Sequence, residues 1–202
     1  LYAGVDTQDG AGVKLTRVLT QQLQERLDPY LMLDNFKSHN PDDYVAGFPN
    51  HPHRGFETIT YMITGRMRHR DSAGNEGLLQ NGGVQWMTAA SGVIHSELPE
   101  QENGAMEGFQ LWLNLPAKDK MNSARYQHLS HEAIPELELA QAQGTVRVIA
   151  GTYENQTGPA QTHSPMTVLD VQLTAGTKTV LPALEGETTL LYIRSGRLQL
   201  NS

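Results

Sequence analysis

The stretch that decides the fold runs from residue 47 to residue 58 and reads Gly47-Phe48-Pro49-Asn50-His51-Pro52-His53-Arg54-Gly55-Phe56-Glu57-Thr58. Its centre is a His-x-His pair that comes just before a predicted strand. Residues i and i+2 of a strand point to one face and lie about 6.6 Å apart along it, so His51 and His53 can converge on one metal ion. Pro52 between them has no N–H for a hydrogen-bond ladder, and we therefore expect a strand start or a sheet edge here.

A second pattern of the same kind follows in Gly92-Val93-Ile94-His95-Ser96-Glu97. His95 and Glu97 are again at i and i+2, and Gly92 permits a tight turn that brings His95 inward. Two strands that each present two ligands can build a three-histidine, one-glutamate site. Such mixed ligands suit a borderline divalent ion such as Fe, Mn, Ni or Zn. In an octahedral ion, two cis positions would remain open for substrate or dioxygen.

Each motif has a plainer interpretation. A lone His-x-His pair is typical of a solvated surface loop, whereas the two motifs together favour metal binding. Glu57 shares the strand parity of His53 if the strand is regular. We interpret Glu57 as a partner that holds a ligand histidine by its other ring nitrogen, and not as a ligand itself.

The length and overall composition of the chain limit the classes of protein to which it can belong. The chain has 202 residues, enough for one large or two small domains, and its 15 basic and 22 acidic residues give a formal net charge of −7. This balance argues against direct binding to nucleic acid or to an anionic membrane. The absence of cysteine excludes disulfides and thiolate chemistry. No apolar leader or membrane span occurs, so we expect a soluble cytoplasmic protein, although the first residue, Leu1, suggests a missing upstream segment.

Short apolar runs separated by glycine and proline predict an all-β sandwich or barrel. We expect strands at 13–19, 31–36, 58–63, 66–71, 84–88, 93–97, 106–115, 145–153, 167–173 and 188–200, with short helices at 21–27 and 130–142. Strict alternation over 58–63 predicts a half-buried strand. We expect the chain to divide into a metal-binding unit at 1–116, a connecting segment at 117–144 and a second unit at 145–202.

These motifs resemble those of the cupin superfamily and, more narrowly, of the pirin family. Residues 47–58 resemble the first motif, and Gln85-Trp86-Met87-Thr88-Ala89 followed by residues 92–97 resembles the second. Further pirin-like segments are Leu27-Asp28-Pro29-Tyr30 and Gln110-Leu111-Trp112-Leu113-Asn114-Leu115, and the resemblance runs from about residue 13 to residue 200. It implies two stacked antiparallel cupin barrels (a bicupin), one bound iron ion and Glu97, in place of Glu57, as the fourth ligand.

The second barrel is expected to lack metal and to be incomplete. Matching residues 61–66 to residues 192–197 puts Pro182 and Leu184 at the positions of His51 and His53, so no ligand pair is predicted there. His163 is interpreted as a surface loop residue. Because pirins continue through the rest of this barrel, the resemblance implies that the chain is truncated at residue 202.

Two functions follow from the resemblance. The first is a quercetin or flavonol 2,3-dioxygenase, in which the metal binds the flavonol 3-oxygen and Glu97 takes the proton before dioxygen reacts. The alternative is an iron-binding redox sensor that binds a transcription factor or a metabolic enzyme. A cavity of about 300 Å³ or more that opens to the metal would favour catalysis. A third and weaker possibility, a cupin isomerase or sugar-binding role, predicts metal-independent binding.

Other polar and aromatic residues have plainer interpretations. Arg66, Arg68 and Arg70 are interpreted as a solvated strand face and not as a stripe for an acidic partner. His69 is expected to be a core histidine more than a pocket residue. Three large side chains fit either plain core or the wall of a pocket for a flat aromatic substrate: Trp86, Met87 and Trp112.

Overall fold

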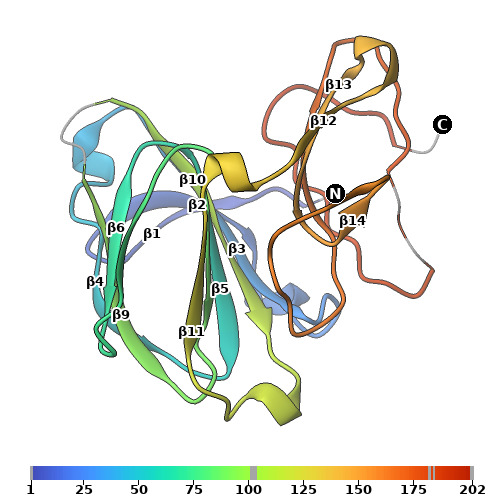
Figure 1. Ribbon diagram of the computed structural model, residues 1–202. Coiled ribbons are helices and arrows are strands. Elements are labelled where there is room, and N and C mark those ends of the chain that lie inside the picture. Colours follow the sequence, from blue (N-terminus) through green and yellow to red (C-terminus); the bar gives the residue numbers. More distant parts are fainter. Residues whose placement is uncertain (1, 101–103, 182, 184, 201–202) are drawn as a thin grey trace.

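Two antiparallel sheets that face each other form the first β unit, strands β1 to β11 (Figure 1). This computed structural model describes residues 2–100, 104–181, 183 and 185–200. The larger sheet has the strand order β1 (Val5–Asp9), β2 (Val13–Leu19), β3 (Tyr30–Ser38), β10 (Met106–Asn114), β5 (Phe56–Thr64), β8 (Val84–Thr88) and β11 (Arg125–Leu129). The smaller sheet has the order β4 (Phe48–His53), β9 (Val93–Pro99), β6 (Met67–Asp71) and β7 (Glu76–Leu79).

The second unit contains β12 to β16 and lies beside the larger sheet (Figure 1). Its main sheet has the order β12 (Glu136–Glu138), β13 (Gly144–Ala150) and β16 (Val168–Leu173), and β14 (Thr152–Tyr153) pairs with β15 (Gln156–Thr157). These strands form only part of a barrel, as expected for an incomplete second cupin unit. Together with the first unit they confirm the predicted all-β fold class. Within the described residues, no helix is both long and apolar enough to cross a membrane.

Three predicted elements differ from the structure. The helix expected at 21–27 is a single 3-10 turn, η1 (Gln21–Leu23), and the helix expected at 130–142 is two such turns, η4 (His131–Ala133) and η5 (Ala140–Ala142), on either side of β12. Pro135 opposes a helix here because it has no N–H, and its carbonyl instead accepts the N–H of Val148 at 2.9 Å. The strand expected at 188–200 is absent among the described residues, where no neighbouring strand offers it a ladder.

Strand β5 has one face toward the smaller sheet and the other toward the second unit. On the inner face, Thr60 Oγ1 donates to Glu97 on β9 at 2.9 Å. On the outer face, Ile59 packs in a cluster that includes Ile149 of β13. The predicted alternation is therefore confirmed, but the prediction of a half-buried strand is wrong, because the second unit covers the face that we expected to be solvated.

The contact between the units is both apolar and polar. The apolar part is a buried cluster that includes Ile59, Trp86 and Leu113 of the first unit and Ile149 and Ala150 of the second. The polar part is built on a buried arginine. Arg147 Nη1 donates to Tyr61 Oη at 2.7 Å, and Tyr61 Oη donates to Asp170 Oδ2 at 2.7 Å. Hydrogen bonds of this kind fix the orientation of one sheet on the other.

The inside of the first unit is layered. A buried apolar cluster closes one end and includes Val13, Phe36, Met62, Met67 and Met106. The side chains of Glu97, Thr60 and Gln110 form a hydrogen-bonded polar layer next to it. The histidines of the two sequence motifs lie beyond that layer, so the apolar cluster is the floor beneath the candidate site.

Candidate metal centre

His51, His53 and His95 come from two neighbouring strands of the smaller sheet. His51 lies opposite His95 in the β4–β9 register. Strand β4 is the edge of its sheet, which accommodates Pro52 as predicted, since an edge residue can lack a ladder N–H. Gly92, at a φ of +135°, donates its N–H to the Ala89 carbonyl at 2.9 Å and makes the turn from which β9 starts.

The ring nitrogens of the three histidines meet at one point. His51 Nε2 lies 2.9 Å from His53 Nε2 and 3.0 Å from His95 Nε2. The three donor atoms all lie within 4.8 Å of one another, and the described residues contain no second group of three or more potential ligands that is as compact. The structure therefore brings together the imidazoles of the two sequence motifs.

This spacing fits a bound metal ion. Metal–nitrogen bonds are about 2.0–2.1 Å long, so two nitrogens bound at right angles lie about 3.0 Å apart. Hydrogen bonding alone accounts poorly for the trio. His51 Nδ1 lies 2.8 Å from the Pro49 carbonyl oxygen, which only accepts, so Nδ1 carries the proton. A neutral His51 then directs a bare Nε2 lone pair at the other two rings, the arrangement usual for a metal-bound histidine.

Burial keeps two of these imidazoles in the neutral form that metal binding requires. Loss of hydration, followed by repulsion from His95 and His51, lowers the pKa of His53 to about 4. Burial, with a smaller repulsion from His51, lowers the pKa of His95 to about 3. Both rings are consequently uncharged at neutral pH, and their lone pairs need lose no proton before a cation binds.

Glu97 is buried near the trio but lies outside the compact donor group. Its Oε1 accepts from Thr60 Oγ1 and its Oε2 from Gln110 Nε2, each at 2.9 Å. Its negative charge acts to raise the pKa of His53. Each carboxylate oxygen has a second lone pair, so these two bonds orient the group without exhausting its capacity to accept.

Glu57 faces away from the centre, on the outer side of the larger sheet. Its Oε1 accepts from Thr88 Oγ1 at 2.7 Å and lies 4.0 Å from His163 Nε2. The interpretation that Glu57 holds a ligand histidine is wrong, because the turn at Gly55, with a φ of +81°, interrupts the strand between β4 and β5 and Glu57 then points outward with Ile59. The interpretation of His163 as a surface residue is also wrong, since its side chain is only 17% exposed and lies 3.7 Å from Asp119.

Aromatic rings form a wall beside His53. The ring centroid of His53 lies 5.1 Å from that of Phe56 and 5.2 Å from that of Trp112. Trp86 instead packs in the cluster that faces the second unit. Met87 is buried in a separate cluster with Val93. Of the three large residues that the sequence suggested for an aromatic pocket, Trp112 is the one shown beside the histidines.

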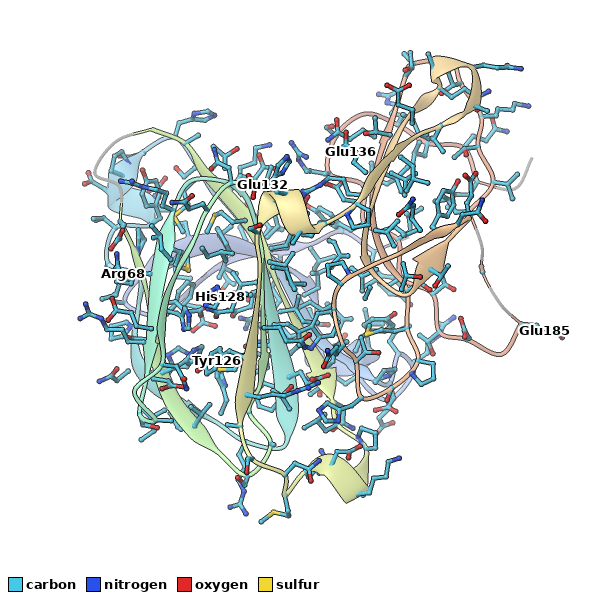
Figure 2. The ribbon with its side chains drawn as sticks, viewed as in Figure 1. Arg68, Tyr126, His128, Glu132, Glu136 and Glu185 are labelled. Atoms are coloured by element: carbon cyan, nitrogen blue, oxygen red, sulfur yellow. The ribbon has the colours of Figure 1, made fainter. Side chains whose placement is uncertain are left out.

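A second pair of histidines lies between the two sheets. Figure 2 shows Tyr126 and His128 directed from β11 into this space. His128 Nε2 lies 2.6 Å from Nε2 of the buried His69, and burial lowers the pKa of His69 to about 4. Gly77 makes room for the pair, because a Cβ there would lie 2.2 Å from His128 Nε2. His69 is thus a core histidine, as expected, with an imidazole partner.

Sequence reasoning missed Tyr126 and His128 because they fall in the predicted connecting segment. In the structure, β11 pairs with β8 at the end of the larger sheet. The available signal was the alternation of Tyr126 and His128 with Arg125 and Gln127, both of which bond outward to Gln161. It was overlooked because a five-residue strand is a weak periodic signal.

The arginines of β6 behave as the plainer interpretation predicts. Arg68 pairs with Glu76 and Glu100, and Arg70 pairs with Glu76, all at the outer surface of the smaller sheet. Figure 2 shows Arg68 on the side of this sheet away from the larger one. Their charges are matched locally, which leaves little excess positive charge for an acidic partner.

Two cavities lie elsewhere on the molecule. One of about 650 Å³ lies over β1 to β3 and is lined by residues that include Asp6, Lys14 and Asn35. The other, of about 370 Å³, lies at the junction of the units beside Tyr61 and Arg147. None of the three histidines lines either cavity. The positions predicted to replace the ligands in the second unit, Pro182 and Leu184, lie outside the described residues.

Comparison with known proteins gives a consistent result. The family model described as Pirin matches residues 12–113. A Pseudomonas aeruginosa protein that is provisionally named quercetin 2,3-dioxygenase is 54% identical over 98% of this chain and 71% of its own length. A pirin-like protein of Caulobacter vibrioides is 46% identical over 99% of this chain and 73% of its own length.

A solved structure supports the fold directly. The crystal structure named quercetin 2,3-dioxygenase from Acinetobacter baumannii superposes with a TM-score of 0.81 at 36% identity. The match covers 87% of this chain and 64% of that one. The present chain therefore spans less than two thirds of that structure.

Proposed function

Because this chain belongs to the pirin family, we propose that it is a metal-dependent dioxygenase that opens the ring of a flavonol such as quercetin. The observation that carries the proposal is the convergence of three Nε2 atoms, with His51 2.9 Å from His53 and 3.0 Å from His95. The names given to the relatives from Pseudomonas aeruginosa and Acinetobacter baumannii support the choice of reaction.

In this proposal His51, His53 and His95 hold one divalent ion and Glu97 is the fourth ligand. Iron(II) is the ion we favour, with Mn, Ni, Zn or Cu as alternatives, because imidazole with carboxylate suits this series. Glu97 supplies a buried negative charge that offsets the charge of the ion. Thr60 and Gln110 hold its carboxylate from the opposite sheet, the kind of outer support that ligating carboxylates usually have.

The chain's own residues would position the substrate and take its proton. When bound, the ion supplies Lewis acidity toward the flavonol 3-oxygen and redox capacity toward dioxygen. Phe56 and Trp112 offer a flat apolar wall beside His53 for the aromatic rings. Glu97 accepts the 3-hydroxyl proton on a carboxylate oxygen, as a general base within reach of the centre. The apolar floor of the first unit limits access of water from below.

The test is anaerobic loading with iron(II), addition of quercetin, and admission of air while the flavonol absorbance is followed. Wild-type protein should lose that absorbance catalytically. Glu97→Gln should retain most of the bound metal, since three imidazoles remain, yet lose turnover by at least about a hundredfold because the proton acceptor is gone. Glu57→Gln is the matched control, a buried carboxylate on the outer face of the larger sheet, and should keep wild-type turnover and metal content.

Two results would count against the assignment. Turnover by Glu97→Gln at the wild-type rate would show that Glu97 is not the base. Absence of turnover in fully metal-loaded, aerobic wild-type protein would remove the dioxygenase assignment itself.

A redox-sensing regulatory role is the second candidate. One observation favours it: His53 and His95 are buried, and a sealed centre suits a sensor, whereas a catalytic site usually needs a cavity that opens to the metal. In this role, oxidation of the bound ion would alter the surface read by a transcription factor or metabolic enzyme. Metal binding without flavonol binding, in the protein as loaded above, would favour this candidate.

A further inference from the structure

We propose that Thr58 and Trp112 form a hydrogen-bonding pair that recognises one oxygen of a planar aromatic ligand at the metal centre. This inference rests on the proposed function and narrows the substrate class to flat aromatic compounds with a keto oxygen next to the metal-binding hydroxyl. It assigns these two residues a positioning role, separate from the ligands and from Glu97.

The first observation is that both residues carry a buried polar atom without a partner among the described residues. Thr58 is 1% exposed, and its Oγ1 makes no hydrogen bond. The indole Nε1 of Trp112 is also buried and unpartnered. Leaving such a group unsatisfied costs about 1–3 kcal/mol, so an unpaired buried group in a native protein calls for a missing partner.

The second observation is that the two groups share one place. Thr58 on β5 and Trp112 on β10 are direct partners in the antiparallel register, so their side chains leave the sheet on the same face. Directly opposite residues have Cβ atoms about 4.5–5.5 Å apart. That face is the inner one, because the adjacent pair on the same two strands, Thr60 and Gln110, donates to Glu97.

The third observation places this pair beside the histidines. The Trp112 ring lies edge-on to His53, with centroids 5.2 Å apart, and is tilted against Phe56 at 4.7 Å. A flat ligand bound at the trio would therefore lie against the same indole whose N–H is unpaired. The neighbouring polar layer does not pair with either group, since the side-chain bonds to Glu97 come from Thr60 and Gln110.

The chemistry of the pair specifies the ligand. An indole N–H can only donate, and a threonine hydroxyl can turn to donate as well. Two donors on directly opposite residues of one sheet face favour a ligand acceptor with two lone pairs, such as a keto oxygen. A flavonol has this oxygen next to its 3-hydroxyl, so the hydroxyl can face the metal while the keto oxygen faces Thr58 and Trp112. A ligand without the keto oxygen would leave both donors buried and unpaired.

Anaerobic titration of 3-hydroxyflavone into zinc-loaded protein tests this directly, because zinc does not support oxidation and the flavonol spectrum reports binding. Thr58→Val keeps the shape and removes the hydroxyl, while Trp112→Phe keeps an aromatic ring and removes the N–H. Each should weaken binding about tenfold, the value of one hydrogen bond of about 1.4 kcal/mol, with zinc content unchanged. Trp86→Phe is the matched control and should bind within about twofold of wild type, since Trp86 has an unpartnered Nε1 on the opposite face.

The outcomes separate this inference from the proposed function. Wild-type affinity in both Thr58→Val and Trp112→Phe would overturn the inference and leave the dioxygenase proposal standing. Equal weakening by Trp112→Phe and Trp86→Phe would also overturn it, because a general packing defect would then explain the loss. Failure of the wild-type, zinc-loaded protein to bind the flavonol would overturn both the inference and the dioxygenase proposal. Should Trp112→Phe not fold, the isosteric Thr58→Val decides alone.

Discussion

The two histidine clusters of the first unit look alike and differ in what they can bind. In the trio, His51 Nε2 lies 2.9 Å and 3.0 Å from two other ring nitrogens. In the pair, His69 Nε2 and His128 Nε2 lie 2.6 Å apart. The pair has no third donor close enough to form a compact group among the described residues. Close ring nitrogens therefore do not by themselves indicate a metal site.

The numbers of N–H groups and nitrogen lone pairs in each cluster explain the difference. One N–H shared between two rings satisfies the pair as an ordinary hydrogen bond. The trio cannot be satisfied in this way, because His51 Nδ1 is committed to the Pro49 carbonyl and its Nε2 has only a lone pair to offer two neighbours. A cation at the meeting point would use all three lone pairs. The number of converging lone pairs, and what anchors the ring, thus distinguish the two clusters.

The largest expected effect is on metal retention. His95→Ala, alone or with His51→Ala, should remove bound metal after desalting, because two or fewer imidazoles remain. We expect affinity to fall by more than about a hundredfold, beyond the 10–100-fold typical of losing an outer support. His128→Ala should retain one equivalent by elemental analysis. Equal metal loss from both variants would contradict the claim that the trio binds metal and the pair does not.

The next effect is on thermal stability. Metal at about 100 times its dissociation constant stabilises the folded state by about 2.7 kcal/mol. For a chain of this length, that corresponds to a rise in melting temperature of about 5–10 °C. Wild type and His128→Ala should both show the rise in calorimetry, and His95→Ala should not. A rise that persists in His95→Ala would place the metal elsewhere.

A smaller effect concerns pH, to which both clusters contribute. The folded pKa values of His53 and His69, about 4, and of His95, about 3, lie below the unfolded value of about 6.5. Between these values the unfolded chain binds more protons, so stability is greatest above about pH 6.5 and falls as pH drops toward 4.

Bound metal should make this fall steeper, because protons then also compete with the ion for the trio. Urea midpoints at pH 7, 6 and 5, with and without chelator, measure both slopes. His69→Asn should flatten the metal-free slope while leaving the extra, metal-dependent fall in place. Stability that rises on acidification in this range would contradict the burial argument.

The smallest effect is expected from Gly77→Ala. The added Cβ would lie 2.2 Å from His128 Nε2 and 2.6 Å from His69 Nε2, so the pair must separate. Because His128 is exposed and can turn outward, we expect a loss on the order of 1 kcal/mol in chemical unfolding and no change in metal content. Loss of metal in this variant would show that the two clusters are coupled.

Much of the site could be predicted from sequence because it depends on period-two geometry within single strands. His51 with His53, and the inner parity of Thr58 and Thr60, follow from alternation alone. The place of Glu57 could not be predicted in this way. Gly55, at a φ of +81°, makes a turn between β4 and β5. This turn breaks the alternation of faces, so the direction of Glu57 does not follow from that of His53. His128 was missed for a different reason, since its partner His69 is distant in sequence and only sheet closure brings them together.

Strand β5 also constrains how this chain can change over time. Its inner residues, Thr58, Thr60 and Met62, face the candidate centre and its floor, while its outer residues, Ile59 and Tyr61, hold the second unit. A deletion of one residue would exchange the two faces along the rest of the strand. Threonine hydroxyls would then enter the apolar contact between the units, and bulky side chains would fill the space around the candidate metal centre. Substitutions can be accepted here one at a time, but insertions and deletions damage both faces together, so length variation should be confined to the turns that flank β5.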